Sequence, residues 1–319
     1  MCSIVLVTYL NRSGSSFLFE QVSKSLDVIT CLEAEVLIYE LLLRPHKHLS
    51  EYGLNCIFDW IITDPKLSSW NLTKEDITDL DPNDNHIETF TKILKCYARK
   101  VKPTANTIFF KGTKLIDFFL NYQDIIKENN FHTLCILRDP RAVFNSQKSN
   151  LSSIARRSFS YNPLTFVFEW NSFTKKVYHL KQNKKTILLI YDEIIKNPQS
   201  IICKLSSIIP QINYEDEQTG DYFSRLPYNQ VHLHKNIIAE ANAKRVKAWE
   251  YELDKIDALI VSKLANNQKE FLPFTNYFYK VTTKDSILMV FYIFFYFLLS
   301  FKKAYDKFRY KLMSFFHIS

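Results

Sequence analysis

Short apolar runs alternate with stretches of helical periodicity along most of the chain. Runs rich in β-branched and aliphatic residues predict strands at 4–9, 28–32, 107–110, 133–137 and 187–191. Helices are predicted at 16–26, 37–43, 88–100, 115–127, 141–147, 161–181, 198–208 and 244–264. Strands that alternate with helices in this way are typical of an α/β fold, with a central, mostly parallel sheet flanked by helices.

Two regions depart from this alternation. Residues 46–86 are rich in Asp, Pro, Ser and Asn, and they are expected to form an insertion with short helices that covers a site. No low-complexity linker divides the chain before the C-terminal region. We therefore predict one domain over residues 1–280, followed by a hydrophobic and basic segment over 281–319.

The C-terminal segment contains an apolar stretch at 286–301 without a charged residue. It is slightly shorter than a bilayer-spanning helix needs to be. Lys280 and Lys284 precede it, and basic residues interleaved with aromatic ones follow it. This pattern favours a membrane-surface anchor for anionic lipids, while a buried core helix is the alternative.

The amino-acid composition indicates the net charge of the protein and the compartment in which it is expected. Hydrophobic residues make up 47% of the 319 residues and charged residues 23%, which is a globular composition. A net charge of +8 suits an anionic ligand, nucleic acid or an anionic membrane, although a general bias toward Lys and Asn explains it equally well. The 6 cysteines are scattered, and the N-terminus lacks a signal-peptide pattern, so a reducing, cytoplasmic location is expected.

A polar loop follows the first predicted strand and precedes the first predicted helix. Its residues are Arg12, Ser13, Gly14, Ser15, Ser16 and Phe17. Free N–H groups at the start of a helix, serine hydroxyls and an arginine together favour a bound phosphate. The loop lacks the Gly-Lys-Ser/Thr of a Walker A motif. A solvated, serine-rich turn that merely caps the helix is the alternative.

A second anion-binding element follows the strand at 133–137. The sequence there is Arg138-Asp139-Pro140-Arg141, and Ser146 lies about two helical turns further on. Arg138 is suited to a bidentate pair with a phosphate. The alternative is a surface Arg–Asp pair at a helix start. Together the two elements point to a ligand with two separated phosphates, held without a metal.

These stretches resemble the carbohydrate sulfotransferases that use 3′-phosphoadenosine 5′-phosphosulfate (PAPS). Residues 12–18 (RSGSSFL) are similar to that family's 5′-phosphosulfate loop, and 136–146 (ILRDPRAVFNS) to its 3′-phosphate element, with Arg138 and Ser146 at the matching positions. Residues 111–115 (KGTKL) and 191–198 (YDEIIKNP) agree with two further family segments. The resemblance implies a P-loop NTPase-like sulfotransferase fold and PAPS as co-substrate. The acceptor it implies is a hydroxyl of a carbohydrate or glycolipid.

The resemblance also implies a general base, because the acceptor hydroxyl must lose its proton. Glu33 lies at the family's distance after the loop, but Ala34 replaces the proline that follows the base in the family, which leaves Glu35 as a rival. A solvated carboxylate is the alternative. Lys111 or Lys114 is a candidate for stabilising the leaving group, and either is equally interpretable as a surface lysine.

Other readings stay open at this point. His46 and His48, like His232 and His234, have metal-ligand spacing but no evident third ligand, and neither a metal nor nucleic acid is expected as a partner. Residues 234–245 are interpreted as a basic lid over the 3′-phosphate. The alternative functions are an ATP-dependent kinase of the P-loop type and a non-catalytic nucleotide-binding protein at a membrane surface.

Overall fold

The computed structural model divides the chain into two compact units. The first comprises Met1–Arg138 and His179–Ala243, and the second comprises Asp139–Tyr178 and Lys244–Ser319. The structure describes residues 2–149, 162–182, 186–209, 220–227, 245–265 and 281–315, and the single positions 212, 231 and 274. From residue 300 onward it describes the backbone alone.

A five-stranded parallel sheet forms the centre of the first unit. Its strands are β1 (Ser3–Tyr9), β2 (Val28–Thr30), β3 (Thr107–Lys111), β4 (His132–Leu137) and β5 (Thr186–Ile190). They lie in the order β2-β3-β1-β4-β5, and every pair is parallel. All residues of β1 are buried, which is why its central residues 4–7 form a continuous apolar run and not an alternating pattern. The predicted α/β fold with a parallel sheet is confirmed.

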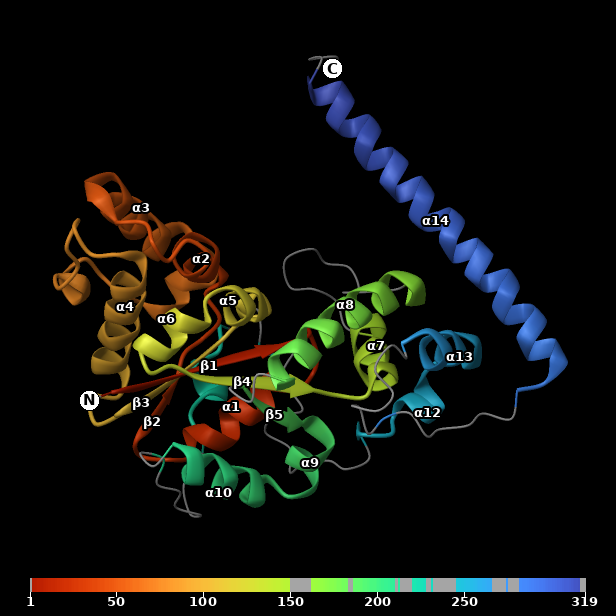
Figure 1. Cartoon of the computed structure of the whole chain (residues 1–319), viewed down its shortest axis with the longest axis horizontal. Helices are drawn as coiled ribbons and strands as arrows, with labels where there is room; N and C mark the ends of the chain where they lie inside the picture. The colour runs from red at the N-terminus through yellow and green to blue at the C-terminus, as the bar shows by residue number, and fades with distance from the viewer. Residues whose placement is uncertain are drawn as a thin grey trace. The chain divides into compact units, whose positions relative to one another are not determined.

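Helices cover both faces of this sheet, with α1 and α10 on one face and α4 to α6 on the other (Figure 1). Their bounds are α1 (Ser15–Ser23), α4 (His86–Val101), α5 (Leu115–Asn121), α6 (Gln123–Glu128), α9 (Tyr191–Lys196) and α10 (Pro198–Ile208). The start of α4 is fixed by a capping box, in which Asn85 accepts from the N–H of Glu88 and the Glu88 carboxylate accepts from the N–H of Asn85.

The region between β2 and α4 consists mainly of helical segments. They are α2 (Glu35–Leu37), a single π-helical turn (Ile38–Leu42), α3 (Ser50–Thr63), and the 3-10 turns η2 (Leu67–Trp70) and η3 (Glu75–Ile77). The prediction of short helices within 46–86 holds except for α3, which has 14 residues. Trp70 is buried against Tyr97 and Phe110, so this insertion shares the apolar core of the unit.

The second unit is built from helices. They are α7 (Pro140–Ser149), most of α8 (Pro163–Gln182), α12 (Trp249–Glu252), α13 (Lys255–Leu264) and α14 (Thr283–Phe315). Asp139 and Arg141 form a buried bidentate ion pair, and the Arg141 guanidinium lies 4.0 Å from the centre of the Trp249 ring. The interpretation of this pair as a surface Arg–Asp contact was therefore wrong.

Two predicted helices are interrupted. The helix expected over 244–264 is broken at Leu253, whose backbone is extended, and Asp254 then caps α13 by accepting from the N–H groups of Ile256 and Asp257. The helix expected over 115–127 divides at Tyr122, whose hydroxyl donates to the carbonyl of Leu43. In the first case a capping side chain competes with helix continuation, and in the second a tertiary contact does.

Candidate active site

The loop after β1 has the backbone geometry of an anion site. Arg12 and Gly14 both have positive φ, at 71° and 89°, and the N–H of Ser13 donates back to Leu10. The turn leads directly into α1 at Ser15, and Gly14 at the N-cap position has no side chain to cap that helix. The first N–H groups of a helix lack partners within it, so this N-terminus offers donors and a positive dipole end.

Ser13 adds a side-chain donor that has no hydrogen-bond partner among the described residues. Its Oγ is buried and makes no hydrogen bond to any residue the structure describes. An unsatisfied buried hydroxyl is costly unless a ligand or water meets it. Phe17 is also buried, and its N–H donates to the carbonyl of Gly14, so its assignment to donor binding stays a prediction.

Arg138 lies beside this loop because β1 and β4 are neighbouring parallel strands. One of its guanidinium nitrogens donates to the carbonyl of Arg12 at 3.0 Å, and the guanidinium stacks 4.3 Å from the centre of the Tyr191 ring. Arg138 therefore contacts the loop, while its assignment to the 3′-phosphate stays a prediction. Ser146 lies on α7 of the second unit, and its place beside Arg138 stays a prediction.

Lys111 at the end of β3 reaches into the same loop and is completely buried. Its ammonium donates to Ser16 Oγ at 2.8 Å and lies 3.5 Å from Ser15 Oγ. The rings that surround it belong to Tyr9, Phe19 and Tyr222, with centres 4.8–5.7 Å away. Lys111 is thus no surface lysine, whereas Lys114 is exposed.

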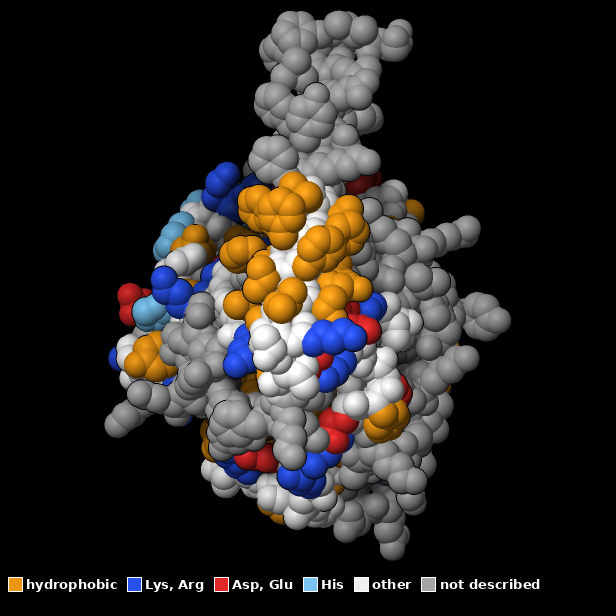
Figure 2. Space-filling model, turned by 90° about the vertical axis from the view of Figure 1, so that its right-hand side faces the viewer, with side chains coloured by type: hydrophobic (Ala, Val, Ile, Leu, Met, Phe, Trp, Pro, Cys, Tyr) orange, Lys and Arg blue, Asp and Glu red, His pale blue; other side chains and the backbone are white. Residues whose placement is uncertain are grey.

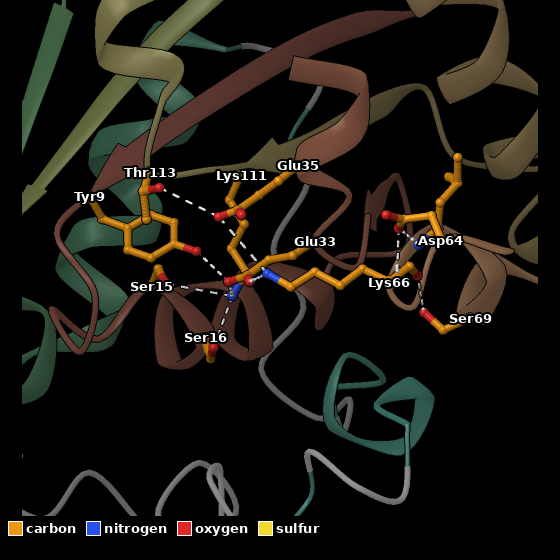
Figure 3. A network of polar contacts seen from close by, with 11 residues as sticks. Tyr9, Ser15, Ser16, Glu33, Glu35, Asp64, Lys66, Ser69, Lys111 and Thr113 are labelled. Atoms are coloured by element: carbon orange, nitrogen blue, oxygen red, sulfur yellow. Dashed lines mark hydrogen bonds and ion pairs between the residues drawn. The ribbon is translucent and has the colours of Figure 1, made fainter. Parts of the chain in front are cut away.

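Glu33 follows β2 and meets Lys111 at the carboxyl edge of the sheet (Figure 3). Lys111 Nζ lies 3.6 Å from Glu33 Oε1, and the Tyr9 hydroxyl donates to the same oxygen. The other carboxylate oxygen accepts from Lys66 Nζ at 2.8 Å. Glu33 is therefore part of an ion-pair network, and its interpretation as a merely solvated carboxylate does not fit these contacts.

Lys66 is a member of the network that sequence reasoning missed. It precedes η2 in the insertion, where the Asp64 carboxylate accepts from the N–H groups of Lys66 and Leu67 and so fixes the turn. Its ammonium also lies 3.9 Å from Glu35, which accepts from Thr113 Oγ1. Both candidate bases, Glu33 and Glu35, thus contact Lys66. Of these two carboxylates, Glu33 is the one with a described contact to Lys111.

The charges of the network shift its pKa values in opposite directions. Burial disfavours the charged form of Glu33, but Lys111 and Lys66 outweigh it and hold the pKa of the carboxyl well below its usual range. Burial lowers the pKa of Lys111 to about 8, although Glu33 opposes the shift. Burial and Glu33 both raise the pKa of Tyr9. At neutral pH the site therefore holds an ionised Glu33 facing two ammonium groups.

The remaining site predictions concern histidines and the basic lid. His46 packs against the Tyr122 ring and His48 contacts the carbonyl of Asn83. In the described part of the chain no three His, Cys, Asp or Glu side chains gather as metal ligands would. His232, His234 and most of the predicted lid over 234–245 lie outside the described residues.

Replacing Gly14 should damage this loop selectively. A Cβ at Gly14 would lie 2.1 Å from the Tyr191 ring, and its φ of 89° disfavours other residues. We expect Gly14→Ala to lower the free energy of unfolding by about 1–3 kcal/mol, measured by urea denaturation. Gly53→Ala, within α3, is the control and should be neutral or slightly stabilising. Equal stability of the two variants would contradict the described loop geometry.

Comparisons with known proteins were made by sequence and by structure. No protein-family model matches the sequence, and no curated protein is significantly similar to it. The structure is similar to the sulfotransferase domain from the curacin biosynthetic pathway, with a TM-score of 0.51 and 13% identity over 83% of this chain and 98% of that one. The chain has a sulfotransferase fold.

A second similar structure is the sulfotransferase domain of the Synechococcus PCC 7002 olefin synthase. It gives a TM-score of 0.46 and 13% identity over 86% of this chain and 96% of that one. In the sulfotransferase fold of this chain, the loop after β1 and the end of β4 meet at the carboxyl edge of the sheet. From β1 the chain first continues to β2 and β3 on one side of β1 and then to β4 and β5 on the other. Open α/β sheets bind ligands at the carboxyl edge beside such a switch point.

Proposed function

We propose that the chain is a sulfotransferase that transfers a sulfuryl group from PAPS to a hydroxyl of a carbohydrate or glycolipid. The observation that carries the proposal is the buried Lys111 ammonium, which lies at the uncapped N-terminus of α1 and contacts Glu33 as well. A cation beside helix N–H donors suits a phosphosulfate, and an adjacent carboxylate suits the removal of a hydroxyl proton.

The residues of the loop fit the donor in charge and in shape. Ser13 supplies a buried hydroxyl without a protein partner among the described residues, and Gly14 supplies a position without a side chain. In this proposal residues 12–16 hold the 5′-phosphosulfate, and Arg138 with Ser146 holds the 3′-phosphate. PAPS supplies the activated sulfuryl group, and no metal is required.

In this proposal Glu33 and Lys111 have different catalytic roles. Glu33 accepts the acceptor hydroxyl's proton at a carboxylate oxygen. Lys111, with Ser15 and Ser16, stabilises the negative charge that develops on the 5′-phosphate of 3′-phosphoadenosine 5′-phosphate (PAP) as PAP leaves the sulfuryl group. By analogy with phosphoryl transfer, most of the rate enhancement comes from positioning and charge stabilisation. The fixed contacts of Lys111 to the loop serve that purpose.

The ion pairs of Glu33 indicate when it becomes an effective base. A carboxylate held ionised by two ammonium groups has a low pKa and binds a proton weakly. An anion bound beside Lys111 would cancel part of the positive potential at Glu33 and raise its pKa. Donor binding would therefore strengthen Glu33 as a base, so that proton removal follows the arrival of the donor.

The acceptor class rests on the motif resemblance and on the insertion. Lys66 brings the insertion into contact with Glu33, so the insertion is the proposed source of acceptor contacts. A transfer assay with radiolabelled PAPS against lipid and polysaccharide extracts of the source cells would identify the acceptor. Label that enters neither fraction would contradict the proposed acceptor class.

The nucleotide preference tests the proposal against an ATP-dependent kinase. We expect PAP to raise the melting temperature without Mg²⁺, and ATP with Mg²⁺ to have little effect. Arg138→Ala should weaken PAP binding in calorimetry by about 1.5–3 kcal/mol, the scale of a charged hydrogen bond. Arg99→Ala, which removes an exposed arginine of α4, is the matched control and should leave PAP affinity unchanged.

Three results would argue against the proposal. A clear preference for ATP over PAP would favour the kinase. Unchanged PAP affinity in Arg138→Ala would remove the assigned 3′-phosphate contact. PAP binding without any sulfuryl transfer would support the non-catalytic alternative.

A further inference from the structure

Among the described residues, helix α14 contacts the rest of the second unit along one narrow stripe. Its first turn is held by Asp285, which accepts from Lys255 Nζ at 2.8 Å and from the N–H and hydroxyl of Thr282. Further along, the Tyr296 hydroxyl donates to Asp257 at 3.1 Å. Met289 and Ile293 are partly covered and lie between these contacts at the spacing of one helix face.

The other faces of the described part of α14 are apolar and exposed. The large hydrophobic side chains there are Ile287, Leu288, Val290, Phe291, Tyr292, Phe294, Phe295, Phe297, Leu298 and Leu299, each at least 36% exposed. Figure 2 shows hydrophobic side chains gathered along this helix. An apolar patch of this extent on a folded chain marks an interaction surface.

The distribution of these side chains around the helix favours lipid over a second copy of the chain. A partner helix packs against one further stripe and would leave the remaining aromatic side chains in water. Acyl chains can instead cover several faces of a helix at once. The extent of the exposed apolar surface therefore fits a lipid phase better than it fits a dimer interface.

The charges that follow point in the same direction. After the uncharged residues 286–301 the helix continues through Lys302, Lys303, Lys307, Arg309 and Lys311, with Asp306 as the one acidic residue. Parallel packing of two such helices would bring like charges together, whereas anionic headgroups attract them. The basic half of α14 thus complements a negatively charged membrane surface.

We propose that α14 binds the surface of a bilayer that contains anionic lipids. Its residues 286–301 insert among the acyl chains of one leaflet, and residues 302–315 lie among the headgroups. The apolar part is about 24 Å long at 1.5 Å per residue, which is less than the roughly 30 Å of a hydrocarbon core. Consistent with insertion and not spanning, none of the helices in the described ranges is long and apolar enough to cross a membrane.

Vesicle flotation of the full chain tests this surface. Wild-type protein should float with vesicles of phosphatidylcholine containing phosphatidylglycerol, and less with phosphatidylcholine alone. The double variant Phe291→Asp/Phe294→Asp should lower the partition coefficient about ten-fold or more, because two inserted rings become charged. Phe168→Asp on α8 is the matched control, since Phe168 is 75% exposed but lies outside α14. It should float like the wild type.

A second variant separates the electrostatic contribution to membrane binding from the contribution of apolar insertion. Lys302→Gln/Lys303→Gln should reduce binding to anionic vesicles by about five-fold per lysine and leave binding to neutral vesicles unchanged. Wild-type protein that floats with neither vesicle, or an equal loss in Phe168→Asp, would overturn the proposal. So would a stable dimer in sedimentation that Phe291→Asp/Phe294→Asp converts to monomer without any lipid binding. PAP binding is independent of these outcomes, so the proposed enzyme activity stands or falls separately.

Discussion

Glu33→Gln should reduce sulfuryl transfer by about 10²–10⁴-fold, because the amide keeps the shape of the side chain but cannot accept the hydroxyl proton. PAP affinity should be kept or increased, since Lys111 loses a carboxylate that competes with the donor's phosphosulfate. Transfer of label from PAPS measures the first effect, and calorimetry measures the second.

Glu35→Gln is the matched control for that substitution. Glu35 is bonded to Thr113 and lies 3.9 Å from Lys66, in a partly exposed pair of the kind that contributes little. Its loss should change the transfer rate by less than about five-fold. A loss of rate in Glu35→Gln together with full activity in Glu33→Gln would identify Glu35 as the base. Full activity in both variants would contradict carboxylate catalysis at this site.

Lys111→Met should remove most of the charge stabilisation while leaving the fold intact. Methionine has a similar length and packs well among the rings of Tyr9, Phe19 and Tyr222. We expect the transfer rate to fall about 10²–10³-fold, the scale seen when one preorganised donor is lost. PAP affinity should fall about ten-fold or more. Lys114→Met is the control, because Lys114 is exposed on the turn before α5.

The pH dependence of PAP binding gives a second measure of Lys111. Burial lowers the pKa of this lysine to about 8, so it is mainly protonated below that pH and mainly neutral above it. Since only the protonated form attracts an anion, PAP affinity should decline as the pH rises through about 8. The decline should be absent in Lys111→Met. A wild-type affinity that is flat from pH 7 to 10 would contradict the assigned role.

The sequence predicted the elements whose signal is local. Strand β1 was predicted from its apolar run, the loop at 12–16 from its glycine and serines, and α1 from its helical pattern. Each of these signals needs only neighbouring residues. Arg138 was predicted at the carboxyl end of a strand, and it directly follows β4, so this position is confirmed, whereas its contact with the 3′-phosphate stays a prediction. The predicted role of Ser146 depends on the second unit and stays a prediction.

The sequence did not predict the partners that come from distant segments. Lys66 belongs to an insertion without periodicity, and nothing local links it to Glu33. Lys111 carried a signal that could have decided between its two interpretations: it is the last residue of the buried strand β3, in a sheet covered on both faces, where a lysine needs a specific partner. Tyr9 likewise ends β1, and its hydroxyl reaches Glu33 only because β2 folds back beside β3.

The strand order has a consequence for synthesis on the ribosome. β1 is made first, yet its two neighbours in the sheet are β3 and β4, whose residues follow about a hundred or more positions later. At roughly 5–20 residues per second, the apolar β1 waits on the order of ten seconds for β4 to be made. During that interval the nascent chain exposes an unpaired, mainly apolar strand, which is the kind of segment that chaperones bind. Production of the folded protein should therefore depend on chaperone supply.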